Sequence, residues 1–249
     1  MPTIPSLEPS RRALLCAAGA TALLAVNPLA AIAQGTAPKL KIATIGAGRE
    51  GGALGALFVK EGHEVMFSSR HPEQLKDMVA GLGALAKAGT PAEAVAFADV
   101  ILLVVPYTAV AEIGKEFGAS LAQKKLVIDV SNPIARRDGE DLVKKINEEG
   151  GAGVATQKAL PGAHIVRAFN AIGSGQLADL AHRQGEPAAV PIAGDDQAAL
   201  QLASQLIKEI GFEPVLVGGL AMGKYLRPGT PLAGEHSPAE IRQIAATLK

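Results

Sequence analysis

Three glycines near the start of the chain are spaced so that a peptide backbone can hold a phosphate group. The first glycine of a G-x-G-x-x-G pattern permits a tight turn, the second lets the backbone approach the phosphate, and the third allows the next helix to pack closely. N–H groups at the start of that helix then face the anion. The pattern predicts a pyrophosphate-binding turn, and its residues are Gly46, Ala47, Gly48, Arg49, Glu50 and Gly51.

The segments around this turn have the order that the turn requires. Residues 41–45, with the sequence KIATI, contain several β-branched side chains and predict a strand. Residues 53–60 have helical character, and residues 64–67 predict a second strand after a turn at Gly62 and His63. A β-α-β unit with this glycine pattern at its first turn is the fingerprint of dinucleotide binding.

The end of the second predicted strand indicates which dinucleotide is bound. Sites that prefer NAD usually place an acidic residue there, which accepts hydrogen bonds from the ribose hydroxyls. This chain has Ser68, Ser69 and Arg70 instead. Two hydroxyls and a guanidinium suit a 2′-phosphate, which a carboxylate would repel. We therefore expect NADP(H), while the alternative interpretation is that Arg70 is a solvated loop residue.

The composition argues against several other classes of protein. The chain has 249 residues, of which 48% are hydrophobic, so it is long enough to bury a sizeable core. Its 24 basic and 24 acidic residues give a formal net charge of zero, and only 3% of its residues are aromatic. We therefore expect neither a basic surface nor a base-stacking platform for nucleic acid. The five histidines are scattered without metal-ligand spacing, and no metal site is expected.

Residues 1–33 have the features of an export signal. Arg11 and Arg12 precede an apolar run that closes with an A-x-A cleavage pattern at Ala33, and the paired arginines resemble a twin-arginine signal. We expect cleavage after Ala33 and a periplasmic or exported protein. An uncleaved membrane anchor is the less favoured alternative, because glycine, asparagine and proline interrupt the run. The only cysteine, Cys16, lies in this segment, so no disulfide is expected in the rest of the chain.

After the glycine turn, predicted strands and helices alternate to the end of the chain. Such alternation predicts an α/β fold, here a Rossmann-like, doubly wound, mainly parallel sheet with helices on both faces. We expect one domain over residues 38–249, with a cofactor half at about 38–135 and a smaller C-terminal α/β part at about 150–249. The later predicted strands are residues 100–105, 126–130, 165–166, 190–192 and 212–217.

In sheets of this kind, ligands bind beyond the carboxyl ends of the strands. Three segments in such positions contain residues that suit a binding site: residues 104–107, 131–133 and 167–170. Proline and asparagine are also common in turns, so these residues have a purely structural alternative. That alternative is strong for Pro133 and is weighed evenly against a binding role for Pro106 and Asn170.

The order and spacing of several motifs resemble those of the deazaflavin (coenzyme factor 420)-dependent NADP oxidoreductase family. The resemblance spans nearly all of residues 40–232. Its motifs are Ile45-Gly46-Ala47-Gly48, Gly62-His63-Glu64-Val65, Ser68-Ser69-Arg70, Ala98-Asp99-Val100 through Pro106, Val127-Ile128-Asp129-Val130-Ser131-Asn132-Pro133, Val166-Arg167-Ala168-Phe169-Asn170, Ala193-Gly194-Asp195-Asp196, Gly211-Phe212-Glu213-Pro214-Val215 and Gly218-Gly219-Leu220.

The resemblance implies a role for each part of the site. Residues 47–50 would hold the pyrophosphate, and Ser69 with Arg70 would hold the 2′-phosphate. Val105 and Ala168 would line the nicotinamide side, where hydride passes directly between stacked rings. This chemistry depends on positioning and on the exclusion of water, so we expect no catalytic acid or base. The family often has a small polar residue where this chain has Arg49, which would bind phosphate or alter cofactor placement.

The functional expectation is an NADP-dependent oxidoreductase that transfers hydride between NADP(H) and a deazaflavin- or flavin-like acceptor. The alternatives are a ferric-chelate or small-carbonyl reductase on the same fold, or a non-catalytic NADP-binding protein. We expect a small-molecule acceptor as the partner, no nucleic acid, and contact with a membrane only during export; a homodimer is one option for the assembly. Because NADP(H) is scarce outside the cytoplasm, export with the cofactor already bound is a further hypothesis.

Overall fold

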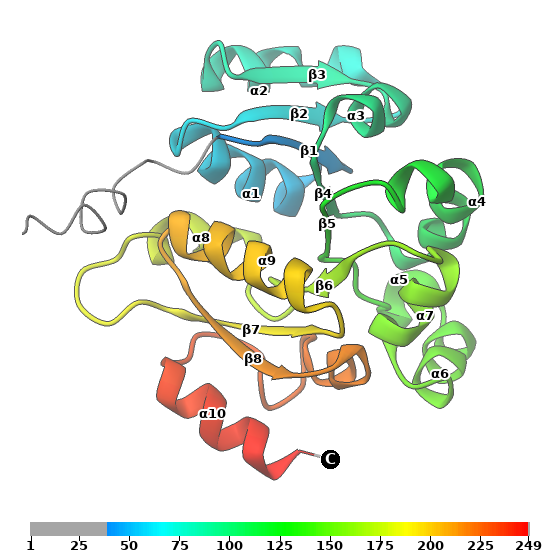
Figure 1. The fold of residues 1–249 in the computed structure, drawn as a ribbon, viewed down its shortest axis with the longest axis vertical. Coiled ribbons are helices and arrows are strands. Elements are labelled where there is room, and N and C mark those ends of the chain that lie inside the picture. The colour runs from blue at the N-terminus through cyan, green and yellow to red at the C-terminus, as the bar shows by residue number, and fades with distance from the viewer. Residues whose placement is uncertain (1–38, 249) are drawn as a thin grey trace, which may run out of the picture. The chain divides into compact units, whose positions relative to one another are not determined.

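The computed structural model describes residues 39–248, which form one eight-stranded sheet with helices on both faces (Figure 1). The predicted export signal lies outside the described residues. The strand order is β3-β2-β1-β4-β5-β6-β7-β8, which confirms the predicted Rossmann-like architecture. The strands are β1 (Lys41–Ile45), β2 (Glu64–Ser68), β3 (Ala86–Gly89), β4 (Val100–Leu103), β5 (Leu126–Asp129), β6 (Ile165–Arg167), β7 (Ala189–Gly194) and β8 (Glu213–Gly218).

Six of the strands, β3 to β6 in sheet order, run parallel to one another. Strand β7 is antiparallel to β6, and β8 is parallel to β7. The register brings Ile45 of β1 opposite Ser68 of β2 and Leu103 of β4, and Leu103 opposite Asp129 of β5. The carboxyl ends of these strands therefore meet at one edge of the sheet, which is where the sequence placed the site.

The helices cover both faces because alternate residues of the central strands are apolar on both sides. In β4, Val100 and Leu102 belong to the core beneath α1, α8 and α9, whereas Ile101 and Leu103 belong to the core beneath α3, α4 and α7. The helices and 3-10 turns are α1 (Arg49–Lys60), η2 (Pro72–Leu75), α2 (Lys76–Leu82), α3 (Pro91–Phe97), η3 (Tyr107–Ala109), α4 (Val110–Leu121), α5 (Ala135–Asp138), α6 (Glu140–Glu148), α7 (Ala152–Ala159), α8 (Ser174–Leu180), α9 (Gln197–Glu209), η4 (Leu220–Tyr225) and α10 (Pro238–Thr247).

Polar side chains fix where several helices begin. Thr90 accepts a hydrogen bond from the backbone N–H of Glu93, whose carboxylate accepts in return from the backbone of Thr90, so a capping box fixes the start of α3. Asp196 caps α9 by accepting from two backbone N–H groups. Within residues 39–248, the structure has no helix with the length and apolarity needed to cross a membrane.

Candidate functional site

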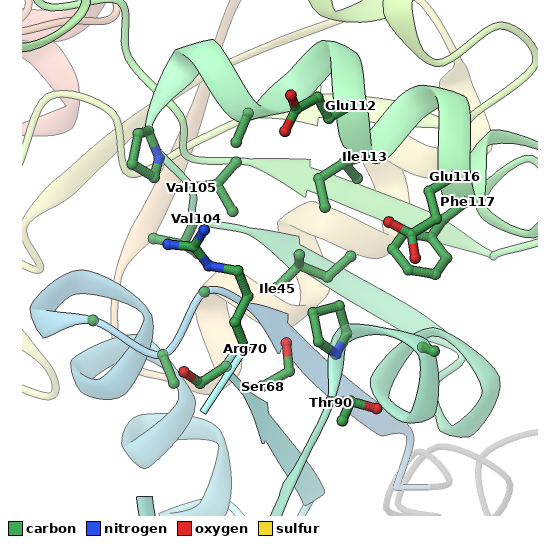
Figure 2. Close-up of a pocket in the computed structure, with 18 of the residues that line it drawn as sticks. Ile45, Ser68, Arg70, Thr90, Val104, Val105, Glu112, Ile113, Glu116 and Phe117 are labelled. Carbon is green, nitrogen blue, oxygen red and sulfur yellow. The ribbon is translucent and has the colours of Figure 1, made fainter. Parts of the chain in front are cut away.

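A cavity of about 900 Å³ lies beyond the carboxyl ends of β1, β2 and β4 (Figure 2). Helix α4 forms the wall opposite the strand ends, and the start of α3 closes one side. The cavity is large enough for a nucleotide cofactor. Its lining includes these residues predicted from the sequence: Gly46, Ala47, Gly48, Ser68, Ser69, Arg70, Val105 and Pro106.

The three glycines of the turn differ in what surrounds them. Gly46 has a φ of +99°, and a Cβ there would lie 2.3 Å from the carbonyl oxygen of Val104. A Cβ on Gly51 would lie 2.0 Å from the carbonyl oxygen of Gly46. In contrast, a Cβ on Gly48 would meet no atom within 4 Å. Gly46 and Gly51 are therefore required by the fold itself, whereas Gly48 leaves open space on the cavity side that a bound pyrophosphate would fill.

Helix α1 begins directly after Gly48 and has no side-chain cap. The first N–H groups of a helix have no partner within the helix, and the helix dipole adds positive potential at this end. An anion at this point is therefore favoured. Arg49 is exposed at the first position of the helix, and neither Arg49 nor Glu50 is among the cavity-lining residues. At the start of α1, the groups that face the cavity and can bind a phosphate are thus those of the backbone.

The residues after β2 have distinct roles. The side chain of Arg70 is exposed and projects into the cavity on the side of Val104 and Val105 (Figure 2). No ion pair within residues 39–248 involves Arg70. Ser69 is half-buried, and its hydroxyl oxygen accepts from the N–H of His71 at 3.0 Å. The hydroxyl proton of Ser69 therefore stays available for a ligand.

Ser68 differs from Ser69 because its hydroxyl is directed into the sheet. The side chain is buried and donates to the backbone carbonyl of Thr44 at 2.7 Å. Ser68 lines the floor of the cavity, but its hydroxyl is engaged in joining β2 to β1. Of the two adjacent serines, Ser69 thus has the hydroxyl suited to a phosphate.

Helix α4 supplies cavity residues that the sequence reasoning did not identify. Ile113 and Phe117, four residues apart, form an apolar strip, and Glu112 and Glu116 lie beside it (Figure 2). Thr90, which follows β3 directly and caps α3, lines the same space. An apolar strip next to hydrogen-bond acceptors can receive a flat heteroaromatic ring. The signal available in the sequence is the i, i+4 spacing of Ile113 and Phe117, which by itself indicates only a helix.

The residues expected on the nicotinamide side fall into two groups. Strand β4 ends at Leu103, two residues before the end of the apolar run, so Val105 and Pro106 lie in a loop that lines the cavity. Ala168 and Asn170 follow β6, are buried, and are not brought to this cavity. The side-chain amide of Asn170 donates to the carbonyl of Asp129 at 3.0 Å.

Beneath these strand ends lies Tyr107, which is buried just after Pro106. Its hydroxyl donates to the carbonyl of Ala152 at 2.8 Å and lies 3.1 Å from the hydroxyl of Thr156. Burial, together with the nearby carboxylate of Asp129, raises the pKa of Tyr107 to about 12. Tyr107 therefore stays neutral and anchors the loop that carries Val105 to α7. No cluster of side chains suited to a metal ion is present in residues 39–248.

Comparisons with known proteins agree with this geometry. Residues 41–133 match the family described as NADP oxidoreductase coenzyme F420-dependent. This segment runs from β1 through β5 to Pro133 and therefore contains the glycine turn, Arg70 and Val105. Of the resemblance expected over residues 40–232, the family model matches this part. No protein in a curated set matches the chain significantly.

Solved structures share the fold. A hypothetical protein from Sinorhizobium meliloti is 27% identical, with a TM-score of 0.68 over 80% of this chain and 96% of its own. A protein from Arthrobacter sp. FB24, described as an F420-dependent NADP reductase, is 21% identical, with a TM-score of 0.64 over 74% of this chain and 87% of its own. An imine reductase from Myxococcus stipitatus in complex with NAD⁺ is 18% identical, with a TM-score of 0.53 over 76% and 57%. Residues 41–133 thus match the model of an NADP-dependent oxidoreductase family, and the chain has the Rossmann-like fold of NAD(P)-dependent oxidoreductases.

Proposed function

We propose that this protein transfers hydride between NADP(H) and a deazaflavin- or flavin-like acceptor. The observation that carries the proposal is Arg70, which follows β2 and extends a guanidinium without an ion-pair partner among residues 39–248 into the cavity, at the point where a carboxylate would favour NAD. The match of residues 41–133 to the F420-dependent family supports the choice of acceptor.

Each side chain then has a binding or positioning role. The backbone around Gly48 and the start of α1 bind the pyrophosphate, while Arg70 and the hydroxyl of Ser69 bind the 2′-phosphate. Ile113 and Phe117 provide an apolar wall for the adenine ring. When bound, NADP(H) supplies the hydride itself.

The loop after β4 acts on the nicotinamide end. Val105 and Pro106 present apolar surface to the cavity, which would hold the nicotinamide ring against the acceptor and exclude water from between them. Hydride transfer between stacked rings requires no acid or base that touches the reacting carbon. The absence of a histidine or carboxylate from the Val105–Pro106 loop is consistent with this chemistry.

The proposal is tested by a screen of acceptors that follows NADPH absorbance under anaerobic conditions. The acceptors are a factor 420-type deazaflavin, FMN, a ferric chelate and a small aldehyde, each assayed with NADPH and with NADH. We expect oxidation of NADPH by the deazaflavin or FMN at rates well above those with NADH. Oxidation by the ferric chelate or aldehyde alone would assign the protein to the alternative reductases. Quenching of NADPH fluorescence without turnover would identify a binding protein.

We also propose that the protein is exported by a twin-arginine route. The support comes from the sequence alone, namely Arg11 and Arg12 before an apolar run and the cleavage pattern that ends at Ala33. Because this route carries folded proteins, the nucleotide would travel in the cavity already bound. A homodimer is part of the same proposal and is tested by light scattering of the purified protein.

A further inference from the structure

Glu50 occupies an unusual position for a carboxylate. It is the second residue of α1, in the turn whose N–H groups are proposed to bind the pyrophosphate. The backbone N–H of Ser174, the first residue of α8, hydrogen-bonds to its carboxyl group. One carboxyl oxygen of Glu50, Oε1, is buried and has no hydrogen-bond partner in the part of the chain that the structure describes.

Within residues 39–248, no charged side chain compensates a negative charge at this position. Burial raises the pKa of Glu50 to about 7, against the opposing effect of the Ser174 N–H, and no neighbouring charge contributes to the shift. The elements packed against α1 are α8, β1 and β2. Their charged residues, together with those of α1 itself, are Asp179, Lys41, Glu64, Arg49 and Lys60.

The position of these charged groups explains why they do not act on Glu50. Lys41 and Glu64 begin their strands, at the edge of the sheet opposite the glycine turn, and Lys60 ends α1 at that same edge. Asp179 is exposed in the last turn of α8, and Arg49 is exposed at the start of α1. Glu50 thus changes between its neutral and charged forms near neutral pH under the control of burial and of whatever binds beside it.

A bound pyrophosphate is the group that would act on Glu50 most strongly. Both the pyrophosphate and an ionised Glu50 would draw on the same positive end of α1, so they compete for it. Two negative phosphate groups close to a half-buried carboxylate repel it far more strongly than they would in bulk water. The neutral carboxyl group feels no such repulsion.

We propose that Glu50 couples nucleotide binding to the uptake of a proton, so that the site accepts NADP(H) with Glu50 neutral and releases it more readily when Glu50 is ionised. This inference rests on the proposed function, because it requires a dinucleotide at the glycine turn. The result is a site whose occupancy responds to the pH of its compartment. For an exported protein, nucleotide would be retained in mildly acidic surroundings and lost in alkaline ones.

The sign and size of the effect follow from linkage. If binding takes up one proton, affinity falls as pH rises above the pKa of the free site, by at most about tenfold per pH unit. The 2′-phosphate of NADPH also titrates, with a pKa near about 6, and its ionisation strengthens binding to Arg70 as pH rises. The two effects have opposite signs, and above about pH 7 only that of Glu50 remains.

The first experiment measures the Kd of NADPH by fluorescence between about pH 6 and about pH 9 for the wild type, Glu50→Gln and Glu148→Gln. Glu148 lies on the exposed surface of α6, far along the chain from the glycine turn, and is the matched control. We expect the wild type and Glu148→Gln to bind about tenfold more weakly at pH 8.5 than at pH 7, and Glu50→Gln to change by less than about twofold. Parallel profiles for all three proteins would overturn the inference.

A second experiment needs no variant. Calorimetric titration of the wild type with NADPH near pH 7.5, in two buffers with different ionisation enthalpies, counts the protons taken up on binding. We expect uptake of a substantial fraction of one proton, and no measurable uptake would overturn the inference even if Glu50→Gln failed to fold. NADPH that binds with a flat pH profile would reject only the role of Glu50. Failure of NADPH to bind at any pH would reject the proposed function together with this inference.

Discussion

Arg167 and Asp129 form a fully buried ion pair in which Nη1 of Arg167 donates to Oδ2 of Asp129 at 2.6 Å. The two residues face each other in register at the carboxyl ends of β5 and β6. The second carboxylate oxygen of Asp129 accepts from the N–H of Ser131, and Nη2 of Arg167 donates to Asn132 at 3.1 Å. These polar residues hold the carboxyl ends of β5 and β6 together, which gives them a structural role.

We expect loss of either partner of this pair to destabilise the protein strongly. Asp129→Asn leaves the buried guanidinium of Arg167 without its counter-charge, and Arg167→Met does the same to the buried carboxylate of Asp129; either change costs about 3–5 kcal/mol. The measurement is the free energy of unfolding in urea. Glu148→Gln, which removes an exposed pair with Lys144, is the control and should cost less than about 1 kcal/mol. A loss below about 1 kcal/mol for both buried variants would contradict the structural role.

Two alanine substitutions in the glycine turn separate folding from ligand binding. At Gly48 a Cβ meets nothing within 4 Å and φ is −71°, so Gly48→Ala should unfold at nearly the wild-type urea concentration. The added methyl group nevertheless occupies the space where the pyrophosphate approaches, so we expect NADPH affinity to fall by at least about tenfold, or about 1.4 kcal/mol.

Gly51→Ala should have the opposite effect to Gly48→Ala, because it should disturb the fold itself. Its Cβ would lie 2.0 Å from the carbonyl oxygen of Gly46, which cannot move without opening the turn. We expect a loss of stability of about 1–3 kcal/mol, measured by urea unfolding. If Gly48→Ala bound NADPH normally, the glycine turn would not be the pyrophosphate site.

The strands and helices that the sequence predicted are those with strong local signals. In the sequence, β1, β4 and β5 are runs rich in apolar residues, and Thr90 and Glu93 at the start of α3 have the spacing of a capping box. β3, with the sequence AKAG, was not predicted, because it contains no β-branched residue and is a strand only through its pairing with β2. Helix α7 was likewise missed, because it is alanine- and glycine-rich and begins after two glycines with positive φ.

The sequence predicted the parts of the site whose residues lie close together along the chain. It did not predict the parts that depend on how distant segments pack. The glycine turn and Arg70 lie within one β-α-β unit, so their spacing in the sequence was enough to predict that they line the same cavity. The contribution of α4 depends on how this helix crosses the strand ends, which spacing does not encode. Sequence also cannot distinguish Ser68 from Ser69, because the pleat of β2 decides which hydroxyl enters the sheet.

The contact between Asp196 and His164 makes part of the stability dependent on pH. A hydrogen bond from His164, and those from the N–H groups of Ala198 and Ala199, hold the pKa of Asp196 below its usual value. Because the pKa is lowered in the folded state, this contribution is present above the unfolded pKa of about 4 and is lost as pH falls through the folded value.

Asp196→Ala tests this dependence. We expect the variant to lose about 1 kcal/mol near pH 7, where the cap of α9 and its charge are both removed. The difference from wild type should shrink as pH falls below about 4, as followed by urea unfolding at several pH values. Asp196→Asn keeps a capping side chain without the charge, so its free energy of unfolding should lie between those of the wild type and Asp196→Ala. A difference that stays constant with pH would show that the charge of Asp196 contributes nothing.

Export is checked by cell fractionation. We expect the processed protein, beginning at Gln34, in the periplasmic or exported fraction of cells that carry a twin-arginine system. Replacement of Arg11 and Arg12 by lysine should leave the unprocessed protein in the cytoplasm, because the paired arginines are what this route reads. Processing of the lysine variant at an unchanged rate would point to a different export route.

Arg70 decides the choice between NADPH and NADH in the proposed function. Its guanidinium can form charge-assisted hydrogen bonds with the 2′-phosphate, which are worth about 1.5–3 kcal/mol, or about 10- to 100-fold in Kd. We expect Arg70→Gln to weaken NADPH binding by this factor, and Arg70→Glu to weaken it further through repulsion. Since NADH lacks the 2′-phosphate, its affinity should change by less than about threefold in Arg70→Gln.

The measurement for Arg70 is the ratio of the two Kd values from fluorescence titration, which cancels any general loss of folded protein. Arg136→Gln, on α5 and outside the cavity-lining residues, is the control that changes net charge by the same amount. It should leave the ratio unchanged. If Arg70→Gln weakened NADH and NADPH equally, Arg70 would act on the shared part of the nucleotide, such as the adenine ring, and the preference for NADP(H) would have to arise from Ser69 and the loop around it.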